Sequence, residues 1–332
     1  MSFFLLRMMI KTDKTFLLVS HFRKYFHKRS HNETVKGKRI EKEKNRGMKL
    51  YHCIVGDEDY EKKIRLVCAD IDMTLTHRLD PLPEINKRAI EELHRQGIYF
   101  ALASGRSVAQ LKDKVREWDL SFEPELLIGV NGSAMYDGIL GKEEKLLLFE
   151  KDWINEIMDV MDENHYDCHV YIDDYTLFNS PSSHFYELVK KVSRDVRLSD
   201  KREDYLKGDF YKFLLIQPKE QMTEVLEKLQ PLLDRHKDDF KILKTTAESY
   251  EIVHAKTDKS YPLKKFCERH GIDLSEVMSF GDADNDNGML EVSGIGVCLK
   301  NGEECTNKAA DAITELDCGQ GGFGDYLYKH VL

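Results

Sequence analysis

The chain has 332 residues, of which 41% are hydrophobic and 33% charged, a composition typical of a soluble globular protein with about two domains. The stretch nearest to a membrane span, Ser2–Ile10, is interrupted by Arg7 and is far shorter than the roughly 18 apolar residues required. Residues 1–47 carry a net charge of +9, which leaves −18 for the rest of a chain whose total is −9. An acidic body excludes nucleic acid as the main partner, and the lack of a span excludes an integral membrane protein.

The basic N-terminal stretch is interpreted as an extension over residues 1–63 that is disordered or partly outside the fold. The alternative is a targeting arm or a helix lying on a membrane surface. The seven cysteines are scattered, their number is odd, and no two form a Cys-x-x-Cys pair. This usage favours reduced thiols and a cytoplasmic location.

The first predicted elements alternate between short apolar runs and amphipathic segments. The pattern predicts strands over Ile64–Ala69, Tyr99–Ala103 and Leu126–Val130, and helices over Leu82–Gln96 and Ser107–Trp118. Parallel strands with helical crossovers between them form a doubly wound sheet. The sequence therefore predicts an α/β fold built on a parallel sheet.

The pattern changes after residue 150, where strands occur close together and are rich in aromatic residues. The predicted helices there are Asp152–Glu163, Ser183–Arg194 and Glu220–Arg235, and the strands are Cys168–Phe178, Phe210–Gln217, Phe240–Lys244 and Tyr250–His254. The alternation then resumes with helices Tyr261–His270, Asn287–Val292 and Glu303–Ala310 and strands Val277–Phe280 and Gly296–Leu299, before a glycine-rich turn at 319–324. We expect a sheet core interrupted by an inserted α+β domain at 151–250.

Two aspartates follow the first predicted strand. Asp70 and Asp72 stand at its carboxyl end, where open parallel sheets carry their sites. One such carboxylate can attack a phosphorus atom, and the next can act as general acid and base. Thr74 can orient the loop through hydrogen bonds from its side chain to the backbone.

The second predicted strand also ends in polar residues. Ser104 offers a hydroxyl, Gly105 permits close approach of the backbone, and the start of the next helix favours an anion. The alternative is an ordinary turn in which Ser104 or Ser107 is the helix N-cap. Arg106 either reaches the substrate or lies on the surface.

Two further segments complete the set of polar residues. Lys259 precedes a predicted helix and could hold a phosphoryl group against neighbouring carboxylates. Asp282, Asp284 and Asp286 follow the strand Val277–Phe280. Two acidic strand ends far apart in sequence indicate one Mg²⁺ site that the fold closes.

In order and spacing, these segments resemble the haloacid dehalogenase-like (HAD) superfamily, specifically its Cof-type phosphatases of subclass IIB. The matching segments are Asp70–Leu75, Ser104–Arg106, Lys259 and Gly281–Asp286, and Asn131-Gly132 and Gly294–Asn301 are also similar. The resemblance covers about Ile64 to the C-terminus. It implies a Rossmann-like core, residues 64–150 and 251–332, with the insert at 151–250 acting as a cap that sets substrate specificity.

The resemblance also implies a phosphoric monoester hydrolase that requires Mg²⁺ and works through an aspartyl-phosphate. Asp70 is then the nucleophile and Asp72 the acid and base, and the metal ligands are Asp70, the backbone carbonyl of Asp72, Asp282 and Asp286. The phosphate-binding residues are expected to be Thr74, Ser104, Gly105, Arg106, Lys259 and Asn285. The expected substrate is a small phosphorylated metabolite, such as a sugar phosphate or a nucleotide-like cofactor, and the protein is expected to act as a monomer or homodimer.

The sequence departs from the family at Met73, where the family usually has glycine, and this puts efficiency and substrate range in question. Two other functions fit the same residues. A phosphotransferase or phosphomutase would pass the phosphoryl group to a hydroxyl instead of water. A non-catalytic regulatory binding module is disfavoured because Asp70, Asp72, Lys259 and Asp282 are all present.

Overall fold

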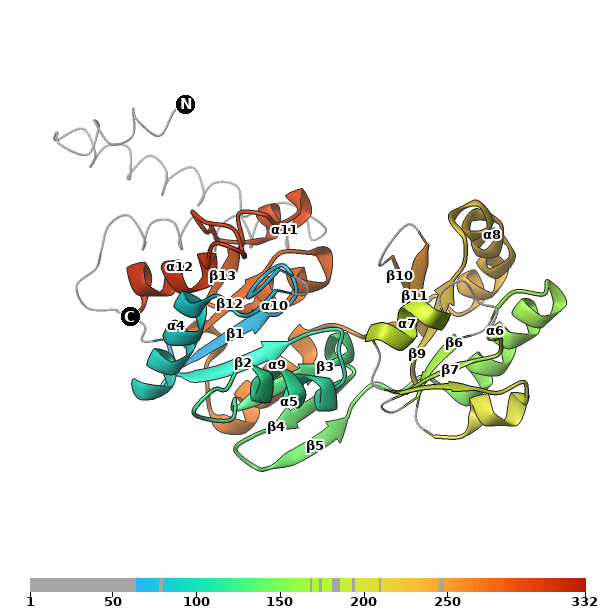
Figure 1. Ribbon diagram of the computed structural model, residues 1–332, viewed down its shortest axis with the longest axis horizontal. Helices are drawn as coiled ribbons and strands as arrows, with labels where there is room; N and C mark the ends of the chain where they lie inside the picture. The colour runs from blue at the N-terminus through green and yellow to red at the C-terminus, as the bar shows by residue number, and fades with distance from the viewer. Residues whose placement is uncertain are drawn as a thin grey trace, which may run out of the picture. The chain divides into compact units, whose positions relative to one another are not determined.

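The computed structural model describes residues 64–77, 80–167, 169–172, 175–180, 186–192, 195–208, 210–244 and 248–332, which form two β-sheets with helices packed on them (Figure 1). The predicted extension over residues 1–63 lies outside these residues, and so do Cys53 and Cys168. Among the helices that the structure describes, none has an apolar segment of the length needed to cross a bilayer.

The first sheet has eight strands in the order β14-β13-β12-β1-β2-β3-β4-β5. Its elements are β1 (Leu66–Asp70), β2 (Tyr99–Ala103), β3 (Leu126–Gly129), β4 (Ala134–Asp137), β5 (Lys142–Lys145), β12 (Val277–Gly281), β13 (Ile295–Cys298) and β14 (Ala312–Ile313). The strands from β14 to β3 are parallel, and the hairpin of β4 and β5 adds two antiparallel strands at the edge. The parallel sheet predicted from the sequence is therefore present.

Helices cover both faces of this sheet. The helices are α4 (Glu84–Arg95), α5 (Val108–Glu117), α9 (Ser260–His270), α10 (Asn287–Val292), α11 (Glu304–Ala309) and α12 (Gly322–His330). One face carries alternate strand residues such as Val67 and Ala69, which pack with α4, α5 and α12. The other carries Leu66 and Cys68, which pack with α9 and α10. Since successive strand residues point to opposite faces, β1 is buried on both sides, as its continuous apolar sequence requires.

The second sheet belongs to the inserted α+β cap and has the order β10-β11-β9-β6-β7-β8. Its elements are β6 (His169–Ile172), β7 (Tyr175–Phe178), β8 (Asp195–Leu198), β9 (Phe210–Ile216), β10 (Phe240–Lys244) and β11 (Ser249–His254), with helices α6 (Lys151–Glu163), α7 (Tyr186–Val192) and α8 (Lys219–Arg235). Residues of α6, α8 and one face of β9 and β11 form a separate hydrophobic core. All pairs in this sheet are antiparallel except β7 with β8.

Several elements differ from the sequence predictions. The hairpin of β4 and β5 was not predicted because Lys142–Lys145 is entirely charged and lies on the sheet edge. The predicted strand Cys168–Phe178 contains two strands, β6 and β7. The second half of the predicted glycine-rich turn at 319–324 is helical, because α12 begins at Gly322, and Gly321 precedes it in the left-handed conformation. The cap sheet extends to His254, whereas the predicted insert ended at residue 250.

Candidate active site

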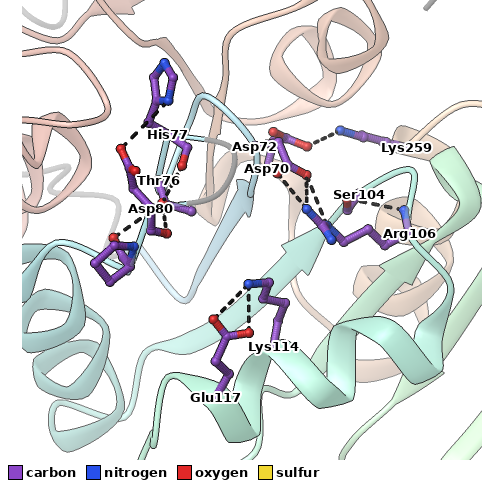
Figure 2. A network of polar contacts seen from close by, with 11 residues as sticks. Asp70, Asp72, Thr76, His77, Asp80, Ser104, Arg106, Lys114, Glu117 and Lys259 are labelled. Atoms are coloured by element: carbon purple, nitrogen blue, oxygen red, sulfur yellow. Dashed lines mark hydrogen bonds and ion pairs between the residues drawn. The ribbon is translucent and has the colours of Figure 1, made fainter. Parts of the chain in front are cut away.

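The carboxyl ends of the parallel strands place a buried lysine among carboxylates. Asp70 is the last residue of β1 and is 7% exposed, and Lys259 immediately precedes α9 and is completely buried. The ammonium Nζ of Lys259 lies 2.6 Å from Oδ1 of Asp70 and 2.6 Å from Oδ1 of Asp286 (Figure 2 shows the pair with Asp70). Burial alone would lower the pKa of Lys259, but the charges of Asp286 and Asp70 raise it above its usual value.

Three carboxylates share this single lysine. Asp70, Asp282 and Asp286 each offer an oxygen within 4.8 Å of the others. Burial raises the pKa of Asp70 well above its usual value, although Lys259 opposes the shift. Burial, followed by the charge of Asp286, raises the pKa of Asp282 to about 7. The site therefore has two more carboxyl groups than ammonium groups, and oxygen-rich sites of this kind suit a hard divalent cation.

Backbone and hydroxyl donors fix the acidic loop after β12. Oδ2 of Asp286 accepts hydrogen bonds from the amides of Asp282 at 2.9 Å and Ala283 at 3.1 Å. The hydroxyl of Thr74 donates to Oδ1 of Asp282 at 2.8 Å. The sequence predicted a backbone partner for Thr74, whereas its hydroxyl donates to a carboxylate of the acidic cluster. The phosphate contact of Thr74 stays a prediction. These bonds hold the carboxylates in place before any ligand arrives.

Asp72 and Arg106 form a bidentate ion pair. The guanidinium of Arg106 donates to both carboxylate oxygens of Asp72, from Nη2 at 2.7 and 2.9 Å and from Nε at 3.1 Å (Figure 2). Both side chains are partly exposed, at 29% for Arg106 and 32% for Asp72. The sequence left open whether Arg106 reaches the substrate or lies on the surface, and the structure gives it a partner that was not predicted. Arg106 fixes the direction of the Asp72 carboxylate.

The two serines of the loop after β2 make different contacts. Ser107 is the N-cap of α5, where it forms a capping box with Gln110. Ser104 is buried, and its Oγ accepts a hydrogen bond from the amide of Arg106 at 3.3 Å. The N-cap alternative therefore applies to Ser107 and leaves the Ser104 hydroxyl at the strand end beside Asp72 and Arg106 (Figure 2).

Asn285 lies at the exposed rim of the acidic loop. Its Nδ2 donates to Oδ1 of Asn131 at 3.1 Å, and the Asn131 side chain in turn lies against Gly105. Asn285 and Gly105, both predicted from the sequence to bind phosphate, are thus joined by a residue for which no role was predicted. The signal available in the sequence was the Asn131-Gly132 pair after a buried strand, interpreted there only as a turn and a family segment.

Comparison with known proteins gives a consistent family. The family model of the haloacid dehalogenase-like hydrolases matches residues 67–327. The chain is 26% identical over 260 residues to a 5-amino-6-(5-phospho-D-ribitylamino)uracil phosphatase of Bacillus subtilis, covering 78% of this chain and 92% of that protein. It is 23% identical over 283 residues to a protein of Streptococcus pyogenes described as a phosphatase, covering 81% and 99%.

Solved structures agree on the fold. A Thermotoga maritima protein superposes with a TM-score of 0.72 at 26% identity, covering 80% of this chain and 97% of that one. A HAD subclass IIB sugar phosphatase superposes with a TM-score of 0.64 at 20% identity, covering 80% and 98%. The family, the fold and the enzyme class predicted from the motifs are confirmed: the chain belongs to the haloacid dehalogenase-like hydrolases and is an enzyme of their phosphatase type.

Proposed function

We propose that the protein is a Mg²⁺-dependent phosphatase that hydrolyses small phosphorylated metabolites through an aspartyl-phosphate. The observation that carries this proposal is the cluster of Asp70, Asp282 and Asp286 around Lys259. Three buried carboxylates against one ammonium favour a bound cation, which would let all three carboxylates stay ionised. The cluster lies at the carboxyl ends of parallel strands, the usual place for a site in such a sheet.

The residues present fit a magnesium ion. Carboxylate oxygens of Asp70, Asp282 and Asp286, together with the backbone carbonyl of Asp72, would hold it, and these are the hard oxygen ligands that Mg²⁺ prefers. When bound, Mg²⁺ would offset the charge of the phosphoryl group and keep the neighbouring carboxylates ionised.

The proposed reaction has two displacements at phosphorus. A carboxylate oxygen of Asp70 forms a bond to phosphorus while the ester P–O bond breaks, and the leaving oxygen takes a proton from the carboxyl group of Asp72. Water then attacks the same phosphorus after giving a proton back to Asp72, and the P–O bond to Asp70 breaks. The Lys259 ammonium offsets the negative charge of the phosphoryl oxygens, and Ser104 and Asn285 supply further donors.

Arg106 has a place in this scheme that follows from its contacts. Its bidentate bond holds the Asp72 carboxylate in one orientation. Asp72 must nevertheless carry a proton to the leaving oxygen. We therefore propose that Arg106 loosens its hold on Asp72 when a substrate phosphate provides a competing anion.

The proposed substrates are sugar phosphates or phosphorylated nucleotide-like metabolites. Supporting this are the relatives that act on 5-amino-6-(5-phospho-D-ribitylamino)uracil, at 26% and 24% identity. We propose that the insert predicted at 151–250, whose sheet continues to His254, selects among such substrates, and that residues 64–150 and the chain after this sheet form the core. We also propose that the protein works in the cytoplasm as a monomer or homodimer. The described cysteines Cys68, Cys267, Cys298, Cys305 and Cys318 are free, which suits a reducing compartment.

The test is release of inorganic phosphate from a panel of esters that includes 5-amino-6-(5-phospho-D-ribitylamino)uracil and several hexose phosphates. Wild type with Mg²⁺ should release phosphate, and neither wild type in EDTA nor Asp70→Asn should do so. Turnover that persists in EDTA would remove the metal from the proposal. Consumption of ester without free phosphate would instead indicate transfer to another hydroxyl, and no consumption of any ester would contradict the enzymatic proposal.

A further inference from the structure

The turn between β3 and β4 has an unusual backbone. Val130, Asn131 and Gly132 all have positive φ, at 50°, 54° and 101°. Glycine adopts such angles freely and asparagine tolerates them, but a β-branched residue such as valine rarely does. Connecting two antiparallel strands does not require a valine there, since hairpin turns use Gly, Asn and Asp at these positions. The surrounding contacts must therefore hold Val130 in place.

Those contacts run first to the loop that follows β2. The amide of Val130 donates to the carbonyl of Arg106 at 2.8 Å, and the amide of Asn131 donates to the carbonyl of Ser104 at 2.9 Å. The side chain of Asn131 then accepts the hydrogen bond from Asn285 at 3.1 Å. One residue thus connects two loops that are far apart in sequence and that both carry proposed phosphate-binding residues.

The same turn also contacts the segment that presents Lys259. A Cβ atom added at Gly132 would lie 2.1 Å from the carbonyl oxygen of Asp258, so only glycine allows this approach. The hydroxyls of Ser133 and Thr257 are hydrogen-bonded at 3.1 Å, and both residues are buried. The backbone of Asp258, just before Lys259, therefore packs directly against the turn.

We propose that the turn of residues 130–133 is a positioning element that aligns the phosphate-binding groups with one another. Asn131 acts through Asn285, and Gly132 acts through the backbone of Asp258 on Lys259. The inference rests on the proposed function, because it takes the phosphoryl group as the common target of these side chains. Asn131 is a positioning residue, since its described contacts are to the protein groups that surround the site.

The first experiment tests Asn131 with a variant that keeps the backbone free to adopt positive φ. Asn131→Gly should raise the KM for the best ester and the Kd for inorganic phosphate by about two- to tenfold, the effect of one lost hydrogen bond. Asn285→Ala should do the same. If Asn131 acts through Asn285, the double variant should be no worse than Asn285→Ala alone, whereas independent roles would make the two effects multiply.

The second experiment compares two glycines that both have positive φ but have different surroundings. Gly141 has a φ of 63° and open space where a Cβ atom would be added, while Gly132 has a φ of 101° and the Asp258 carbonyl in the way. Both alanine variants strain the backbone, but only Gly132→Ala displaces the segment before Lys259. We expect Gly132→Ala to lower kcat/KM by about 10²-fold, as misplaced catalytic groups do, and Gly141→Ala to leave it unchanged.

The outcomes separate this inference from the proposed function. If wild type hydrolyses the ester and Asn131→Gly has the same KM and phosphate Kd as wild type, the role of Asn131 is overturned and the phosphatase proposal stays intact. Equal kcat/KM for Gly132→Ala and Gly141→Ala, both folded by circular dichroism, would overturn the role of Gly132. If wild type hydrolyses no ester, the proposed function fails, and the Kd of inorganic phosphate decides the inference: no binding by wild type, or binding unaffected by Asn131→Gly, overturns it.

Discussion

The core and the cap each bury a lysine, and the two lysines differ in what surrounds them. Lys259 of the core is fully buried and contacts two carboxylates, with the third carboxylate of the cluster nearby. Lys212 on β9 of the cap is 7% exposed and pairs with one carboxylate, that of Glu251 on the adjacent strand β11, at 2.6 Å. In both places the lysine Nζ lies 2.6 Å from a carboxylate oxygen, and both lysine side chains are buried.

The difference between them is the balance of charge. The Lys212–Glu251 pair is neutral in sum, so the cap needs no further ion there, although Oε2 of Glu251 is buried without a hydrogen-bond partner among the described residues. The cluster around Lys259 instead has three carboxyl groups for one ammonium, so it is balanced only by protons or a bound cation. Burial of a lysine therefore does not distinguish a proposed catalytic site from a structural ion pair in this protein, whereas an unbalanced set of carboxylates does.

The largest effect should come from removing the lysine of the unbalanced site. Lys259→Met removes the ammonium group that the three carboxylates share, and it removes the positive charge proposed to offset the phosphoryl oxygens. We expect phosphate release to fall by at least about 10³-fold, the scale seen when a charge that stabilises the transition state is lost. Steady-state kinetics on the best ester would measure it, with Lys212→Met as the matched control. Comparable losses of kcat in both variants would break the distinction between the two lysines.

The balanced pair should affect stability instead. Lys212→Met leaves the buried carboxylate of Glu251 without its ion-pair partner. We expect this change to lower the free energy of unfolding of the cap by roughly 3–5 kcal/mol. The double variant with Glu251→Leu should recover most of this loss, because it removes both charges. Urea unfolding followed by the fluorescence of Trp153, which packs in the cap core, would report it. A double variant no more stable than Lys212→Met would show that the charge is not the cause.

Acid should weaken the cap through a buried histidine. Burial lowers the pKa of His169 to about 3, from 6.5 in an unfolded chain, because the charged form is excluded from the core. A lowered pKa gives stability that is complete above pH 6.5 and is lost progressively as the pH falls toward 3. The glutamine of His169→Gln cannot take up a proton. Below pH 6.5 the free energy of unfolding of this variant should therefore fall less steeply than that of wild type, and the two slopes should differ by up to about 1.4 kcal/mol per pH unit. Identical slopes would contradict this assignment.

The smallest effect concerns the loop that departs from the family. Met73 has a φ of 71°, an angle that favours glycine, and its carbonyl accepts a hydrogen bond from Asn301 at 2.7 Å. Met73→Gly relieves strain and keeps this backbone bond, but it adds entropy to the unfolded chain. We expect a net stabilisation of up to about 1 kcal/mol in thermal unfolding, with activity retained. A loss of stability would show that the methionine side chain contributes packing that outweighs the strain.

The sequence predicted the parts of the site that follow directly from buried strands. Asp70 ends the apolar run of β1 and Asp282 follows that of β12, and parallel pairing of these strands brings them together, as the pattern indicated. The alternation of helices and strands was enough for the core, because each apolar run is long enough to define its own element. Lys259 was predicted from the need for a cation beside the carboxylates and from the resemblance to the family.

Other features depend on tertiary contacts that no local pattern carries. The partners of Arg106 and Thr74 are 34 and 208 residues away, so their side-chain directions could not be predicted. The positive φ of Val130 opposes the preference of valine and is imposed from outside the turn. The edge strand β5 was not predicted because its four residues are all charged, which suits a sheet edge and resembles a loop.

The measurement that tests the account most directly is a search for the covalent intermediate. Asp72→Asn should slow hydrolysis of the aspartyl-phosphate by about 10²–10⁴-fold, and with an aryl phosphate, whose leaving oxygen needs no proton, the intermediate should still form and accumulate. The variant would be mixed with such an ester in Mg²⁺ or EDTA, quenched in acid, digested and examined by mass spectrometry. The account predicts a phosphoryl group on the peptide that contains Asp70, present with Mg²⁺ and absent with EDTA. Phosphate release by wild type together with an Asp70 that is never modified would contradict it.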